Sequence, residues 1–140
     1  MNKKKNEDNL KDRFMQFQML QKQMEQINEH VELIQRQRGE VIDSIDALEG
    51  LEQVKEGTEV FAPIATGVFI KASFKDTKNL LINVGADTVV ERSVKDVIGL
   101  LKQQDEGLQE KMRQAGEILE HLQEQAMQIY RQVEAVEAEE

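Results

Sequence analysis

Few side chains in this sequence are placed for covalent or metal chemistry. The chain has no cysteine, which excludes thiol catalysis, disulfides and Cys-based zinc sites. Its two histidines, His30 and His121, would lie about one helical turn apart on facing helices, but both fall outside the apolar seams and no carboxylate cluster joins them. The run Gly85-Ala86-Asp87-Thr88 lacks the GxxxxGK[ST] spacing of a phosphate-binding loop. We therefore expect no enzyme activity, no cofactor and no metal ion.

Composition limits the partners that this protein can bind. Its 140 residues correspond to about one domain, and a charged fraction of 32% with only 4% aromatic residues is typical of long solvated helices. The net charge of −9 argues against a nucleic-acid binder, which needs a basic surface to neutralise phosphates. No apolar run approaches the ~18 residues of a membrane span, and the lysines at positions 3–5 are not followed by the apolar segment of a signal peptide. We expect a soluble, cytoplasmic protein that binds neither nucleic acid nor membrane.

Residues 9–56 carry a heptad repeat that predicts a long coiled-coil helix. If Leu10 is position a, ten of the twelve a and d positions up to Leu48 are apolar, and the exceptions are Arg13 and Arg38. At ~1.5 Å per residue such a helix is roughly 70 Å long. Residues 1–8 precede the repeat and are expected to form a disordered tail.

Residues 93–140 predict a second helix with a matching apolar seam. Twelve of its thirteen seam positions from Val94 to Val136 are apolar, and the exception is Asp105. Ser93, followed by an acidic residue in the first turn, resembles a helix N-cap. The two predicted helices are therefore similar in length and in pattern.

Two such helices, reversed by a short centre, should pair antiparallel with Val54 opposite Val94. Both chain ends then lie at one distal end, ~60–70 Å from the centre. Phe14, Met15 and Met19 add apolar surface outside the seam there, opposite residues 126–133. One interpretation is a local widening of the helix bundle. The other is an exposed patch for promiscuous contacts, which flexible methionines suit, and the convergence of two apolar ends favours it.

Residues 57–92 are the only segment that predicts β-structure. Strand candidates occupy residues 59–62, 68–74, 80–84 and 88–91. We expect residues 63–67 to join the first pair, Lys75–Asn79 the middle pair and Gly85–Asp87 the last pair. The strands carry apolar residues on both faces, and two hairpins alone are marginally stable in water. Their uncovered faces and open edges predict self-association or partner subunits.

The expected fold class is mainly α with a small β region. We predict a long antiparallel coiled-coil hairpin with two central β-hairpins. The residues expected to join subunits are apolar or turn-forming members of this centre: Val60, Phe61, Pro63, Gly67, Val68, Phe69, Ile70, Phe74, Leu81, Ile82, Val84, Val89 and Val90.

The central segment resembles the alpha-type subunits of prefoldin, a co-chaperone of archaea and eukaryotes. The resemblance is carried by Glu59-Val60-Phe61-Ala62-Pro63-Ile64, Gly67-Val68-Phe69-Ile70-Lys71-Ala72, Lys75-Asp76-Thr77, Ile82-Asn83-Val84-Gly85-Ala86 and Val89-Val90-Glu91-Arg92-Ser93. The flanking helices agree in length and pattern, and four strands rather than two indicate the alpha type. The sequence departs from the family pattern at Ala65 and Asp87, where glycines are expected.

The resemblance implies a hexamer of two alpha and four beta subunits, in which the β-hairpins contribute to an oligomeric β-barrel. The distal tips would bind non-native polypeptides by hydrophobic contact and deliver them to a group II chaperonin without ATP. The residues implied in this binding are those of the distal ends: Leu10, Phe14, Met15, Phe17, Met19, Leu20, Met127, Ile129, Tyr130 and Val133. The alternative is a coiled-coil scaffold or adaptor subunit of a larger assembly, without holdase activity.

Overall fold

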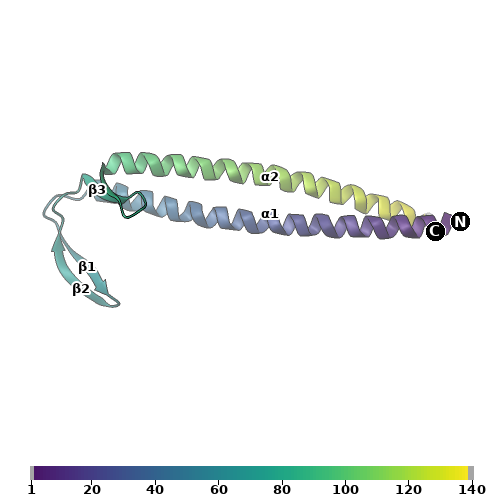
Figure 1. The fold of residues 1–140 in the computed structure, drawn as a ribbon, viewed down its shortest axis with the longest axis horizontal. Helices are drawn as coiled ribbons and strands as arrows, with labels where there is room; N and C mark the ends of the chain where they lie inside the picture. Colours follow the sequence, from purple (N-terminus) through teal and green to yellow (C-terminus); the bar gives the residue numbers. More distant parts are fainter. Residues whose placement is uncertain (1, 139–140) are drawn as a thin grey trace. The chain divides into compact units, whose positions relative to one another are not determined.

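The computed structural model of the chain describes residues 2–138 (Figure 1). Its elements in chain order are α1 (Asn2–Glu52), β1 (Glu59–Ala65), β2 (Val68–Ser73), β3 (Asn79–Asn83), β4 (Val89–Ser93) and α2 (Val94–Ala138). The strands form two separate antiparallel hairpins, one from β1 and β2 and one from β3 and β4. The predicted fold class, two long helices flanking two small β-hairpins, is confirmed.

The chain divides into two compact units. One contains α1 up to Gln37 together with α2 from Leu108 onward, and the other is Arg38–Gly107. In the first unit the two helices run antiparallel and side by side (Figure 1). The second unit contains the remaining turns of both helices and the two hairpins.

Burial along both helices follows the predicted heptads residue by residue. Every a and d position of α1 from Leu10 to Leu48 is buried or half-buried. Among the other described residues of this helix, Leu51 alone is half-buried and the rest are exposed. In α2 the same holds for every seam position from Val94 to Val136, with Val97 as the one addition in the described helix. The buried apolar positions are Ile34, Val41, Val94, Ile98, Leu108, Ala115, Leu122 and Ala126, of which Ile34 and Val94 are fully buried. Removal of this seam from water, at ~25 cal/mol per Å², stabilises the helix pair.

Two of the polar interruptions in the seams are partners of each other. Arg38 Nε donates to Asp105 Oδ1 at 2.8 Å, and Nη2 lies 3.4 Å from Oδ2. The two side chains are only 28% and 15% exposed, so neither charge is well solvated. The ion pair satisfies both groups, and a single polar layer of this kind favours one register between helices.

The helix ends differ from the predicted boundaries. Residues 2–8, expected to be a disordered tail, belong to α1, and Met1 lies outside the described residues. No Pro or Gly interrupts this segment, and Glu7 and Lys11 have the i,i+4 spacing that supports a helix. At its other end α1 stops at Glu52, in a tighter turn in which the amide of Gln53 donates to the carbonyl of Gly50 at 3.2 Å.

The start of α2 agrees with the predicted cap. The backbone N–H of Asp96 donates to Ser93 Oγ at 3.1 Å, which satisfies one of the free amides of the first turn. Asp96 also places a carboxylate in the first turn of the helix, where the helix dipole favours negative charge.

The strands do not form the middle pair that the sequence predicted. Lys75–Asn79 joins the two hairpins instead of closing a β2–β3 turn. Asp76 Oδ1 accepts hydrogen bonds from the backbone N–H groups of Lys78 at 2.8 Å and Asn79 at 3.2 Å. The Asp76 side chain thus satisfies backbone amides of its own segment, and Thr77 beside it is buried.

The two hairpin turns differ in backbone conformation at the positions where the family pattern has glycine. In the first, the loop Thr66-Gly67 lies between the paired residues Ala65 and Val68; Gly67 has φ 75°, whereas Ala65 is not among the described residues with positive φ. In the second, Ala86 and Asp87 both adopt positive φ, 49° and 58°.

The second turn is of the primed type, in which both central residues are left-handed. Its closing hydrogen bond runs from the N–H of Thr88 to the carbonyl of Gly85 at 3.0 Å. Left-handed backbone costs an alanine roughly 1–2 kcal/mol, so this turn stores strain at Ala86.

Candidate functional site

The first unit exposes a group of large apolar side chains near the chain ends. Phe14, Met15, Met19, Met127 and Tyr130 are each between 51% and 63% exposed, and we name them the terminal apolar cluster. They lie outside the heptad seam, so they are not needed to hold the helices together. The interpretation as an exposed patch therefore agrees with the structure better than that of a widened bundle.

The antiparallel register places the two aromatic members of the cluster beside each other. Arg13 donates a hydrogen bond to Gln132, about one helical turn from the register predicted from Val54 opposite Val94. That prediction used Val54, which lies beyond the end of α1, as its reference. The observed register still brings Phe14 next to Tyr130, and both line one groove.

Two shallow grooves lie on the helix pair at this end. The first, the aromatic groove, has a volume of about 270 Å³ and is lined by Arg13, Phe14, Phe17, Ile129, Tyr130, Val133, Glu134 and Glu137. The second, the glutamine groove, has a volume of about 340 Å³ and is lined by Gln16, Met19, Leu20, Gln23, Gln125, Gln128 and Ile129. Phe14 and Tyr130 occupy heptad position e, whereas Gln16, Gln23 and Gln125 occupy position g. The grooves therefore lie on opposite sides of the seam.

The residues predicted for this end have two different roles in the structure. Leu10, Phe17, Leu20, Ile129 and Val133 are half-buried seam positions, so they join the helices and offer only part of their surface. The five members of the terminal apolar cluster offer most of theirs. A binding surface here would consist of the cluster, with seam residues as the floor between its members.

Tyr130 experiences a negative environment in the aromatic groove. A hydrogen bond with the Glu134 carboxylate is the largest cause of a raised pKa at the Tyr130 hydroxyl, followed by the negative charge of Glu134. Desolvation and the charge of Glu137 add to the effect. Both glutamates line the same groove.

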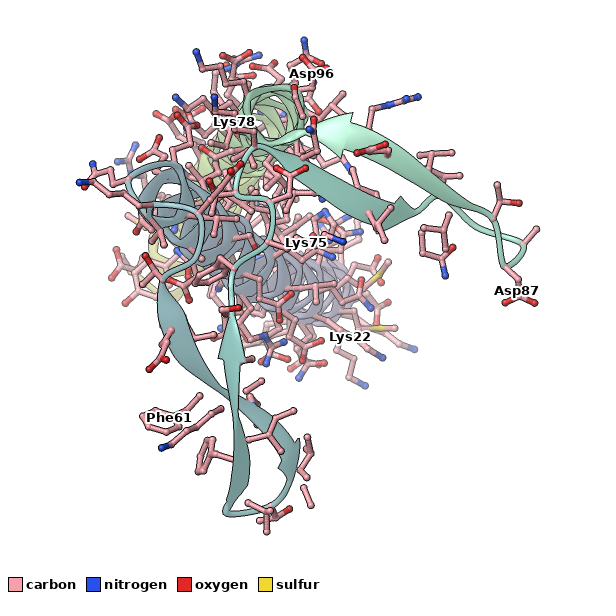
Figure 2. The ribbon with its side chains drawn as sticks, turned by 90° about the vertical axis from the view of Figure 1, so that its left-hand side faces the viewer. Lys22, Phe61, Lys75, Lys78, Asp87 and Asp96 are labelled. Atoms are coloured by element: carbon pink, nitrogen blue, oxygen red, sulfur yellow. The ribbon has the colours of Figure 1, made fainter. Side chains whose placement is uncertain are left out.

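The hairpins expose a second set of apolar side chains. Leu81 is 78% and Phe61 is 70% exposed, and Figure 2 shows Phe61 projecting from the β1–β2 hairpin. Phe69, Val68, Ile70, Val84 and Val89 are also exposed, as are Pro63 and Gly67, while Val60, Phe74, Ile82 and Val90 are half-buried. Asp87 marks the turn at the end of the β3–β4 hairpin in the same view. The predicted joining residues thus form largely uncovered surface.

Several exposed apolar residues were not singled out from the sequence: Leu33, Ile42, Ile64, Leu100 and Ile118. The four on the helices occupy heptad positions other than a and d, so the same count that defines the seam could have identified them. Leu33 and Ile118 belong to the first unit but line neither of its two grooves.

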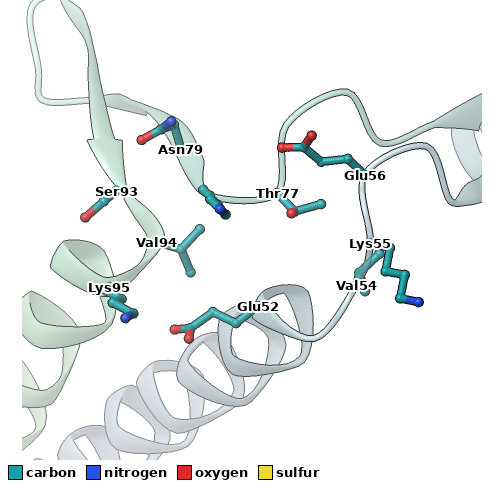
Figure 3. A pocket seen from close by; sticks show the side chains of 10 residues that line it. Glu52, Val54, Lys55, Glu56, Thr77, Asn79, Ser93, Val94 and Lys95 are labelled. Atoms are coloured by element: carbon teal, nitrogen blue, oxygen red, sulfur yellow. The ribbon is translucent and has the colours of Figure 1, made fainter.

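A larger hollow of about 830 Å³ lies in the second unit, where the end of α1, the linker between hairpins and the start of α2 meet (Figure 3). Lys55, Lys78 and Lys95 line it together with Glu52 and Glu56. The N–H of Val94 donates to the carbonyl of Lys78 at 2.8 Å across this junction. Because the lining is of mixed charge and these side chains are exposed, the hollow shows no built ligand site.

Metal and membrane sites receive no support from the described residues. Among residues 2–138 no group of three or more His, Cys, Asp or Glu side chains is arranged to bind a metal ion. In the same range, no helix has a stretch apolar enough to cross a membrane.

Comparison with known proteins identifies the family. The Prefoldin family, described as "Prefoldin subunit", matches residues 5–139. Prefoldin subunit alpha of Methanoculleus marisnigri is 32% identical over 113 residues, which cover 81% of this chain and 75% of that protein. Prefoldin subunit alpha of Methanococcus aeolicus is 33% identical over 91 residues, 65% of this chain and 61% of that protein. The chain belongs to the prefoldin family, and the predicted resemblance to its alpha subunits is confirmed.

A solved structure supports the fold. A chain in the cryo-EM structure of filamentous PFD from Methanocaldococcus jannaschii matches with a TM-score of 0.54 and 13% sequence identity, covering 90% of this chain and 98% of that one. The family is one of co-chaperone subunits and not of enzymes.

Proposed function

We propose that this chain is a cytoplasmic co-chaperone subunit that binds non-native polypeptides at the terminal apolar cluster. The observation that carries the proposal is the exposure of Phe14, Met15, Met19, Met127 and Tyr130 outside a seam that is already complete. Exposed apolar groups that a fold does not need for its own core mark an interaction site. Non-native polypeptides are the partners that offer apolar surface of no fixed shape.

The contact would be driven by hydrophobic burial and would need no nucleotide. Each 100 Å² of apolar surface removed from water contributes roughly 2.5 kcal/mol before ordering costs. Methionine side chains adapt to irregular partners, which suits clients of many sequences. Weak contacts on several subunits at once would add through avidity and could still be released for transfer to a group II chaperonin.

The partner subunits would be joined through the hairpins. The exposed faces of β1–β2 and β3–β4 and the open edges of two-stranded sheets are suited to pairing with other chains. We propose beta-type prefoldin subunits as these partners, in a hexamer of two alpha and four beta chains whose hairpins form a β-barrel. Light scattering of the chain with and without a beta-type subunit tests this assembly.

Client binding is tested with a pair of matched variants. Phe14→Ser with Tyr130→Ser removes two aromatic members of the cluster, and Leu33→Ser with Ile118→Ser removes two exposed apolar residues elsewhere in the same unit. In the complex assembled with beta-type subunits, we expect the first pair to reduce suppression of aggregation of an unfolded client. The second pair should protect as well as the unchanged chain.

A coiled-coil scaffold or adaptor is the competing function, and the same experiment separates the two. A scaffold that acts through its hairpins would assemble normally and lose nothing with Phe14→Ser and Tyr130→Ser. Equal protection after removal of residues 1–20 and 124–140 would likewise rule out binding at the terminal apolar cluster.

A further inference from the structure

The two grooves at the end of the first unit differ in charge. The glutamine groove is lined by four glutamines, a methionine and two aliphatic seam residues, with no charged side chain. The aromatic groove is lined by three aromatic rings and carries two carboxylates, Glu134 and Glu137, at one side. The same apolar end of the protein therefore presents a neutral face and a face with negative groups.

The two carboxylates of the aromatic groove outnumber the one cation that lines it, Arg13, so its lining is net negative. The guanidinium of Arg13 donates to the side-chain oxygen of Gln132. This bond is to a neutral amide, and Gln132 lines neither groove. Among the ion pairs of residues 2–138, none includes Glu134 or Glu137.

The pKa of the Tyr130 hydroxyl shows the effect of these negative charges. Its pKa is raised by the hydrogen bond with Glu134 and by the charges of Glu134 and Glu137, so the anionic form of the phenol is disfavoured in this groove. A positive group placed over the same ring would be favoured for the same electrostatic reason.

We propose that the aromatic groove binds extended client segments in which a lysine or arginine stands beside an apolar residue. The apolar side chain would contact the wall formed by Phe14 and Phe17. Phe14 is 54% exposed, and Phe17 is a half-buried seam residue. The cation would lie over the ring of Tyr130 and near the carboxylates of Glu134 and Glu137. This selectivity rests on the proposed client binding at the same surface and specifies the class of segment taken there.

Peptide binding to the full chain tests the proposal. The probes are three fluorescent peptides with the same leucines and phenylalanines, separated by lysine, serine or glutamate, and binding is followed by fluorescence anisotropy. From the usual strength of exposed ion pairs and cation–π contacts, the lysine peptide should bind about three- to tenfold more tightly than the serine peptide. The glutamate peptide should bind most weakly, and high salt should reduce the differences.

Matched variants separate the groove from the general negative charge of the chain. Glu134→Gln with Glu137→Gln should remove most of the preference for the lysine peptide while retaining binding of the serine peptide. Glu120→Gln with Glu124→Gln changes the same helix and the same net charge outside the two grooves, and it should leave the preference unchanged. Circular dichroism checks that all variants keep their helices.

The outcomes distinguish the selectivity for basic segments from the proposed client binding on which it rests. Equal binding of the lysine and serine peptides, or a preference that survives Glu134→Gln with Glu137→Gln, overturns the selectivity and leaves client binding standing. If the serine peptide still binds after Phe14→Ser with Tyr130→Ser, clients do not bind at the terminal apolar cluster. A chain that binds none of the three peptides contradicts both proposals.

Discussion

Exposed large apolar side chains are grouped in the terminal apolar cluster and in the hairpins, and the backbone beneath the two groups differs. In the terminal apolar cluster the backbone is helical, so only side chains are free to contact a partner. In the hairpins each sheet has two strands, so every strand keeps one edge whose N–H and C=O groups can pair with another chain.

This difference indicates two kinds of contact. Strand edges impose a direction and a register on whatever pairs with them, and aromatic and β-branched side chains there have few rotamers. The methionines of the cluster are flexible and impose little geometry. Similar exposure thus suits a fixed assembly partner at the hairpins and variable clients at the end of the helix pair.

The largest expected effect separates assembly from client binding. Leu81→Ser removes the most exposed of the large apolar side chains in the described chain. If Leu81 is buried between subunits, its loss should weaken assembly by at least about tenfold, because burial of a leucine contributes about 1.5–3 kcal/mol. Sedimentation of the chain with its partner subunits measures this, and Phe14→Ser is the control that should assemble normally. Normal assembly of Leu81→Ser would show that the hairpin face is not an interface.

A smaller effect concerns the ion pair between Arg38 and Asp105 in the second unit. Asp105→Ala leaves the Arg38 guanidinium unpaired and mostly buried, so the free energy of unfolding should fall by about 1–3 kcal/mol. Replacement of both residues by leucine should recover the loss, since two apolar side chains suit the seam. Urea unfolding followed by circular dichroism measures both variants, and neither changes an exposed apolar surface. A loss of client binding with normal stability would contradict a purely supporting role.

The β3–β4 turn offers a stabilising change of about 0.5–1 kcal/mol. Ala86→Gly relieves a left-handed alanine, although glycine loses more chain entropy on folding, so the net gain should be near 0.5–1 kcal/mol. Ala65→Gly is the comparison, because that position lacks positive φ and should gain nothing. Hydrogen exchange of the hairpin amides reports the change. A gain at Ala65 equal to that at Ala86 would refute the account of strain.

The smallest effect is a pH dependence at the linker between the hairpins. Hydrogen bonds from the Lys78 amide and from Asn79 lower the pKa of Asp76 below its usual value of 3.8. A lowered pKa in the folded state means that this stabilisation is present above the unfolded value and is lost as pH falls through the folded one. Asp76→Asn retains an acceptor oxygen and should remove that acid dependence. NMR titration of the linker amides of the unchanged chain and the variant tests this, and an identical acid response in both would assign it to another group.

Much of the helical architecture could be predicted from sequence alone, since a heptad seam is a local property. The positions counted from Leu10 and from Val94 are the positions that the structure buries. Exposure of Phe14 and Met19 followed from the same count, because neither falls in the seam. The extra turns at residues 2–8 were missed since the repeat begins only at Leu10, although the polar residues before it are compatible with a helix.

The strand pairing was predicted less well, for a physical reason. Turn residues at Lys75–Asn79 are compatible with a hairpin and with a linker, and periodicity cannot distinguish them. The strand pairing of the folded chain decides it: β1 pairs with β2 and β3 with β4, which leaves this segment as the linker. Similarly, Asp87 was recognised as a departure from the family pattern, but the strain at Ala86 is a property of backbone angles that no motif reveals.

The sequence by itself determined that the chain has two matched helices, a β-rich centre and no catalytic residues of a recognisable kind. It also showed more apolar residues than a core needs, both near the chain ends and in the β-rich centre. Only the tertiary structure decided how these parts meet. It paired Arg38, one of two exceptions in the first seam, with Asp105, the exception in the second, and it set Phe14 beside Tyr130 with two glutamates in one groove. Heptads specify which face of a helix is buried, whereas register depends on contacts between residues far apart in the chain.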